Sequence, residues 1–151
     1  MRHPGIQVIC LGLLLLGIVV LPTWLQRQPP DQLLATVNGP CPLNAPCNIH
    51  LAGLGDVTLQ IEPRGLPHGK PLEISLKTPE GVNSAQLQFV GESMYMGLQP
   101  VFLEGNPAQG FHATTRISYC TVDQKMRWLA ELRLSTDAGI YQITFALEPL
   151  T

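Results

Sequence analysis

The feature that most constrains this fold is the alternation of apolar and polar residues in short segments. Seven such segments follow residue 56, and Gly, Pro, Asn or Asp residues separate them. The 14 glycines and 14 prolines of the chain are typical of many short strands joined by turns. We therefore predict an all-β fold, an immunoglobulin-like antiparallel β-sandwich of about seven strands. The predicted strands are residues 57–62, 72–77, 85–89, 98–103, 110–119, 125–134 and 139–147.

The last two segments predict which residues face the core. Residues 125–134 place Met126, Trp128, Ala130, Leu132 and Leu134 on one face. Residues 139–147 place Tyr141, Ile143, Phe145 and Leu147 inward. Trp128 is expected in the middle of its strand as a central core residue. A helix over 125–134 is the alternative, but it would have only Trp128 and Leu132 as an apolar stripe.

The N-terminal stretch from Ile6 to Leu25 contains twenty residues and no charge. As a helix it would span roughly 30 Å, enough to cross a bilayer core. Arg2 precedes it and Trp24 lies near its far end, so the positive-inside rule leaves the N-terminus in the cytoplasm. A cleaved signal peptide is the alternative, although no small-x-small site follows Leu25. Either way, the rest of the chain would lie outside the cytoplasm.

These features predict three regions. Residues 1–27 form a transmembrane anchor (or signal peptide), 28–35 a linker with the Pro29-Pro30 pair, and 36–151 a periplasmic domain. We expect a single-pass protein of the bacterial inner membrane. Beyond residue 27 the chain has 7 Lys and Arg against 11 Asp and Glu, a formal net charge of −4. Nucleic acid is therefore not an expected partner, because phosphate binding requires clustered cations.

The cysteines fit an oxidising compartment. Cys10 lies within the apolar stretch and is expected to act as a small apolar residue. Cys41 and Cys47 flank the sequence PLNAP, which can bend sharply enough to close a disulfide. A redox or metal-binding dithiol is the alternative for this pair. Cys120 is left without an obvious partner, so it is either a buried inert thiol or a ligand.

Sulfur-containing side chains near Cys120 predict a copper site. Met94 and Met96 lie two residues apart, hence on one side of an extended backbone. Cys120 and Met126 flank a predicted five-residue turn. Thiolate and thioether ligands select Cu(I). The predicted ligands are Met94, Met96 and Cys120, with Met126 as an optional fourth. The alternative is that these methionines only pack in the core.

The histidines contribute less to this prediction. His112 precedes Cys120 by eight residues, roughly 26 Å along one strand, so the two could share an ion only if the strand is broken between them. His112 could still join Met94 or Met96. His50 and His68 are expected to be exposed in turns rich in Gly and Pro.

The stretch from GESMYMGLQP through FHATTRISYC and KMRWLAELRL to YQITFAL resembles the FixH- and YtkA-like small exported β-sandwich proteins. In those proteins a Met-bearing segment precedes the strands, and many have an N-terminal membrane anchor. The resemblance covers residues 57–147 in pattern and implies copper handling or maturation of respiratory oxidases. The chain departs from the family because its Met segment lacks the usual histidine, with Gly97-Leu98 directly after Met96, and because it adds Cys120 and the Cys41/Cys47 pair.

Catalysis is not expected. The chain contains no G-x-S-x-G, H-E-x-x-H or phosphate-binding glycine loop. Glu62, Glu73 and Glu131 alternate with apolar residues, as on a solvated strand face. The hypothesis is therefore a membrane-anchored periplasmic protein that binds or delivers copper, or assists assembly of a copper or respiratory enzyme. The alternative is a metal-free protein-interaction module associated with a membrane complex.

Overall fold

The computed structural model describes residues 32–67, 69–92, 100–117 and 127–148, and every regular element in these ranges is a β-strand. The all-β fold class is therefore confirmed. The nine strands are β1 (Leu33–Pro42), β2 (Cys47–Leu51), β3 (Gly55–Glu62), β4 (Leu72–Lys77), β5 (Val82–Gly91), β6 (Val101–Asn106), β7 (Gly110–Thr115), β8 (Trp128–Thr136) and β9 (Gly139–Glu148).

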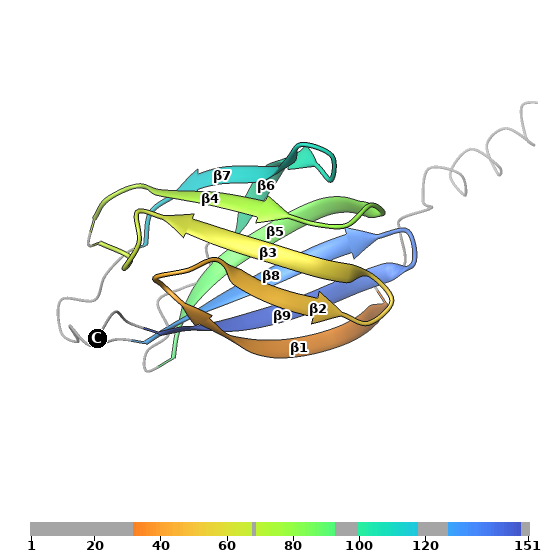
Figure 1. Ribbon diagram of the computed structural model, residues 1–151, viewed down its shortest axis with the longest axis horizontal. Coiled ribbons are helices and arrows are strands. Elements are labelled where there is room, and N and C mark those ends of the chain that lie inside the picture. Colours follow the sequence, from red (N-terminus) through yellow and green to blue (C-terminus); the bar gives the residue numbers. More distant parts are fainter. Residues whose placement is uncertain (1–31, 68, 93–99, 118–126, 149–151) are drawn as a thin grey trace, which may run out of the picture.

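The strands form one mixed sheet that folds over on itself. Their order is β1-β9-β8-β5-β6-β7-β4-β3-β2, and only the β1–β9 pair is parallel. β6 belongs to both halves, because Val101–Leu103 pairs with β5 whereas Glu104–Asn106 pairs with β7. Two facing layers result, which we call the β9 layer (β1, β9, β8, β5) and the β3 layer (β7, β4, β3, β2) (Figure 1).

The hydrophobic core fills the space between these layers. Within β3, β4, β8 and β9 buried residues alternate with less buried ones, as the alternation predicts. The predicted inward faces of β8 and β9 are confirmed at all the described positions, namely Trp128, Ala130, Leu132, Leu134, Tyr141, Ile143, Phe145 and Leu147. The β3 layer contributes Leu51, Val57, Leu59, Ile61, Leu72, Ile74, Leu76 and Phe111. Burial of each large apolar side chain contributes about 1.5–3 kcal/mol to the free energy of folding, so the packing between the two layers holds them together.

The strand count differs from the prediction because β1 and β2 carry weak sequence signals. β1 contains Asn38, Gly39 and Pro40, residues that are depleted in strands, and β2 has only five residues. β1 begins at Leu33, inside the predicted linker, and its backbone pairs with β9. That pairing is a tertiary contact, so local alternation could not predict it.

Two local predictions in the second half of the chain are wrong. Trp128 is buried, but it begins β8 and does not lie in the middle of that strand. The helix alternative for this region also fails, since residues 128–136 are extended. Earlier in the chain, β6 continues through Gly105 to Asn106. Gly105 permits this because its φ is +135° and a Cβ there would lie 2.1 Å from the carbonyl oxygen of Gly110.

The strand directions define two ends of the molecule. At one end the chain enters β1 at Leu33, and the β2–β3, β4–β5, β6–β7 and β8–β9 connections lie there too; we call it the entry end. At the opposite end lie the connection from Cys41 to Cys47, the end of β5 and the start of β8; we call it the disulfide end. Strands of ten residues separate the two ends by about 33 Å.

Candidate functional site

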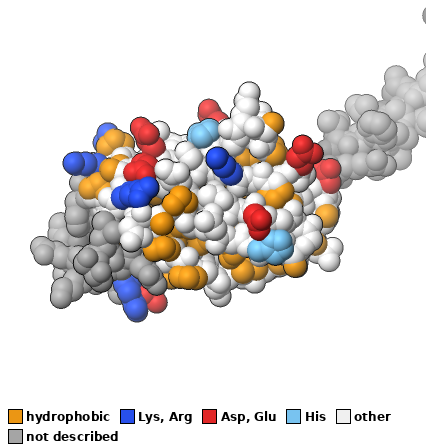
Figure 2. Space-filling model, in the orientation of Figure 1, with side chains coloured by type: hydrophobic (Ala, Val, Ile, Leu, Met, Phe, Trp, Pro, Cys, Tyr) orange, Lys and Arg blue, Asp and Glu red, His pale blue; other side chains and the backbone are white. Residues whose placement is uncertain are grey.

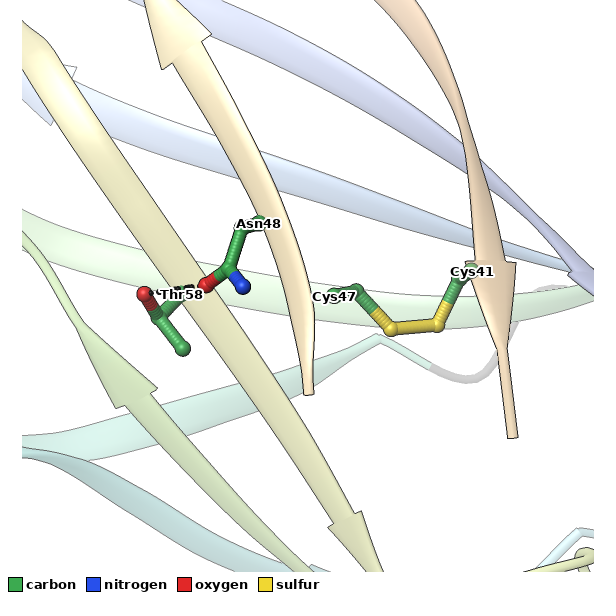
Figure 3. The surroundings of a disulfide bond; sticks show 4 residues. All are labelled: Cys41, Cys47, Asn48 and Thr58. Atoms are coloured by element: carbon green, nitrogen blue, oxygen red, sulfur yellow. Dashed lines mark hydrogen bonds between the residues drawn. A yellow bond between two sulfur atoms is a disulfide. The ribbon is translucent and has the colours of Figure 1, made fainter. Parts of the chain in front are cut away.

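The disulfide between Cys41 and Cys47 joins the two outermost strands of the sheet. Cys41 lies near the end of β1 and Cys47 begins β2 (Figure 3), and their Cα atoms are 4.9 Å apart. Both cysteines are buried. In cross-strand register Cys41 lies next to Leu147, which lies next to Trp128. The predicted disulfide is thus part of the core and closes one side of the folded sheet.

The loop inside the disulfide is held by its neighbours. The backbone N–H of Ala45 donates to the carbonyl of Pro42 at 3.1 Å. Arg64, in the β3–β4 connection, donates to the carbonyl oxygen of Asn44 and forms an ion pair with Glu62 at 3.2 Å. The hydrogen bond from Arg64, followed by that from Gln60, lowers the pKa of Glu62. The contact between Arg64 and Asn44 thus joins the loop closed by the disulfide to the β3–β4 connection.

At the same end the last described residue after β5 meets the first described residue before β8. The N–H of Glu92 donates to the carbonyl of Arg127 at 2.9 Å. The side chains form an ion pair, with Arg127 Nε 2.7 Å from Glu92 Oε2. Glu92 and Arg127 are therefore neighbours at the disulfide end.

The predicted ligands Met94, Met96, Cys120 and Met126 all lie outside the described residues. Their arrangement therefore stays a prediction. In the part of the chain that the structure does describe, no three His, Cys, Asp or Glu side chains come together as a metal site.

His112 lies on the outer face of β7. The sequence predicted no role for it beyond that of a possible nitrogen ligand. Its Nδ1 shares a 3.2 Å hydrogen bond with Ser75 Oγ of β4. In register, Ser75 lies next to His112 and His112 next to Glu104 of β6. This row borders a groove of about 700 Å³ between β6 and β7, which we call the β6–β7 groove. The sequence did not indicate the groove, because it depends on β6 changing layers.

The remaining predicted surface residues are mostly where the alternation placed them. Glu62, Glu73 and Glu131 are on outer faces, and Glu131 accepts a hydrogen bond from Gln88. His50 is exposed as expected, but it lies within β2 and not in a turn, 2.6 Å from Asp56 Oδ1. His68 lies outside the described residues.

An apolar row crosses the outer face of the β9 layer near the disulfide end. Pro40, Ala146, Leu129 and Val90 are consecutive neighbours in register on β1, β9, β8 and β5. Pro40 and Ala146 are exposed, while Leu129 and Val90 are half-buried. Pro40, Leu129 and Ala146 also line a shallow hollow of about 450 Å³. Alternation alone would have placed polar residues here.

Charged side chains of both signs are scattered over the surface. Figure 2 shows basic and acidic groups interspersed on the face drawn, with hydrophobic side chains between them. Among residues 32–148, as far as they are described, no helix is long and apolar enough to cross a membrane. The predicted span at 6–25 lies outside the described residues.

Comparison with known proteins gives no match: no family model, curated protein or solved structure is similar enough to this chain to be assigned to it.

Proposed function

We propose that this protein is an exported, membrane-anchored module of the immunoglobulin-like sandwich kind that binds Cu(I) at its disulfide end. It would deliver the ion to a copper protein or assist assembly of a respiratory oxidase. The ligands would be the thioethers of Met94 and Met96 and the thiolate of Cys120, with Met126 as the optional fourth. Soft sulfur donors are the ligands that favour Cu(I) over harder cations.

The observation that carries this proposal is the contact between Glu92 and Arg127. Met94 follows Glu92 by two residues and Met126 immediately precedes Arg127. The 2.7 Å ion pair and the 2.9 Å backbone hydrogen bond join these two points. The two sulfur-bearing stretches of sequence are thus attached to adjacent strands, β5 and β8. Two segments so attached need little chain length to share one ion.

The direction of the strands supports a role in delivery. The chain enters β1 at the entry end, whereas Glu92 and Arg127 lie at the disulfide end, about 33 Å away. With residues 6–25 in the membrane, the linker would hold the entry end toward the bilayer. The disulfide end would then face a partner protein in the periplasm.

Cu(I) competition against a chelator of known affinity tests the proposal on the full-length protein in detergent. We expect one Cu(I) per chain. Cys120→Ser should weaken binding strongly, and the double variant Met94→Leu with Met96→Leu should weaken it without unfolding, since such swaps usually cost below about 1.5 kcal/mol. His50→Gln is the matched control, because His50 is exposed on β2 at the entry-end side of the fold. Parental affinity in the leucine variant would refute the copper site.

The anchor requires its own measurement. Mass spectrometry of the native protein should find residues 1–27 retained, and carbonate washing should leave the protein in the membrane fraction. A mature N-terminus between Thr23 and Leu34 would show cleavage instead.

A metal-free interaction module is the second candidate, and the apolar row of Pro40, Ala146, Leu129 and Val90 favours it. Exposed apolar rows on an otherwise polar sheet face are typical of protein contacts. The Cu(I) titration separates the two functions, because this candidate predicts no stoichiometric binding.

A further inference from the structure

We propose that the β6–β7 groove binds an extended segment of a partner protein that carries a basic side chain. The groove lies between Val101 and Phe102 of β6 and Ala113 and Thr114 of β7, with Glu73 of β4 beside them. None of the described residues that line the groove is a proposed copper ligand, so the inference stands independently of the copper proposal.

The first argument is the pairing of the strands on either side. Residues 101–103 of β6 pair with β5, so they form no backbone hydrogen-bond ladder with β7. Within the described part of the chain, residues 113–115 of β7 pair only with β4. Two strand edges thus face one groove. Open edges carry unpaired N–H and C=O groups, and an added extended peptide can satisfy them.

The second argument is the side chain at the rim. Phe102 is 71% exposed, a larger fraction than for any other large hydrophobic side chain in the described ranges. Its cross-strand neighbour on β5 is Gln86. A phenyl ring left in water offers a partner both apolar area and a π-face, and a guanidinium or ammonium group can stack on it.

The third argument is charge, which identifies the occupant. Glu73 and Glu104 line the groove, and none of its described lining residues is Lys or Arg. On the other side of Phe102, Arg133 lines a separate hollow of about 210 Å³. The acidic side of Phe102 therefore faces the groove. A basic side chain of the bound segment would contact the phenyl ring and the two carboxylates together.

His112 and Ser75 add polar specificity. Their 3.2 Å hydrogen bond fixes the imidazole over the wall of the groove. The second ring nitrogen remains directed away from that bond, because Nδ1 is the atom engaged with Ser75. His112 and Ser75 thus line the groove with polar groups that can bond to the bound segment.

The test uses the full-length protein in detergent and a labelled seven-residue peptide in which valine and arginine alternate. Fluorescence anisotropy should show saturable binding. The same peptide with glutamate in place of arginine should bind at least about tenfold more weakly. Methylating the backbone nitrogens along either edge of the peptide should abolish binding, because one edge would pair with residues 101–103 of β6 and the other with residues 113–115 of β7.

Variants of the groove locate the site. Phe102→Ala should weaken binding about threefold to fivefold, and Phe102→Leu nearly as much, since leucine restores area without the π-face. Glu73→Gln with Glu104→Gln should weaken it about tenfold. Glu80→Gln is the matched control, because it removes one carboxylate from the β4–β5 connection outside the groove.

Three results would overturn the proposal. The first is equal affinity for the arginine and glutamate peptides, and the second is parental affinity in both the Phe102→Ala variant and the Glu73→Gln with Glu104→Gln variant. The third is concentration-dependent self-association that Phe102→Ala abolishes, which would assign the groove to a second copy of this chain. A loss of Cu(I) binding with intact peptide binding would affect only the copper proposal.

Discussion

Breaking the Cys41–Cys47 disulfide should destabilise the protein by about 2 kcal/mol. The bond closes a short loop with a sequence separation of 6 residues. The loop-closure model then gives about 7 cal/mol/K of entropy removed from the unfolded chain, or roughly 2.2 kcal/mol at 25 °C. A domain of this size loses about 4 °C in Tm per kcal/mol, so Tm should fall by roughly 8–9 °C.

The structure adds an effect that loop length alone does not predict. The bond holds β1 against β2, the two outermost strands, and Gly39 of β1 lies close to Ile49 of β2. Without the bond, these strands keep their pairing with β9 and β3 but lose the cross-link that holds them against each other. Exposed strand edges promote association between molecules, so we also expect faster aggregation on heating.

The assay is thermal unfolding followed by circular dichroism, on the full-length protein with and without reductant. The double variant Cys41→Ala with Cys47→Ala should match the reduced protein and should not respond to reductant. Alanine is preferable to serine because both positions are buried, where a new hydroxyl would need a partner. A reduced protein within about 0.5 kcal/mol of the oxidised one would refute the loop-closure reasoning.

Two further predictions concern individual residues at opposite ends of the molecule. Gly105→Ala should cost at least about 2 kcal/mol in chemical unfolding, because the added Cβ would meet the Gly110 carbonyl oxygen at 2.1 Å and φ is +135°. Gly81→Ala, where φ is +92° and no atom lies within 4 Å of the new Cβ, should cost less, and equal costs would contradict the steric argument. NMR titration should give Glu62 a pKa below its ordinary value, and Arg64→Gln should raise it. Because the pKa of Glu62 is lower in the folded than in the unfolded protein, its pairing with Arg64 stabilises the fold at pH values above the ordinary glutamate pKa. This stabilisation is lost as the pH falls through the folded-state pKa. An unchanged Glu62 pKa in Arg64→Gln would contradict Arg64 as the cause of the shift.

The chain's local patterns were sufficient to predict much of the core. Alternation with a period of two determines which side chains share a face, so the buried faces of β8 and β9 could be assigned without a structure. The Cys41–Cys47 disulfide was also predictable, because the five residues between the cysteines include two prolines, which bend the loop and bring the sulfurs together. The copper ligands Met94, Met96, Cys120 and Met126 stay predictions, since they lie outside the described residues.

Tertiary structure alone decided the features that involve distant strands. β1 is a strand because β9 supplies its backbone partners, not because Asn38, Gly39 and Pro40 favour extension. β6 divides its pairing between β5 and β7, and only this division opens the groove beside Phe102. The physical reason is common to both cases. Side-chain alternation is encoded residue by residue, whereas the choice of backbone partner depends on how the whole sheet folds over its core.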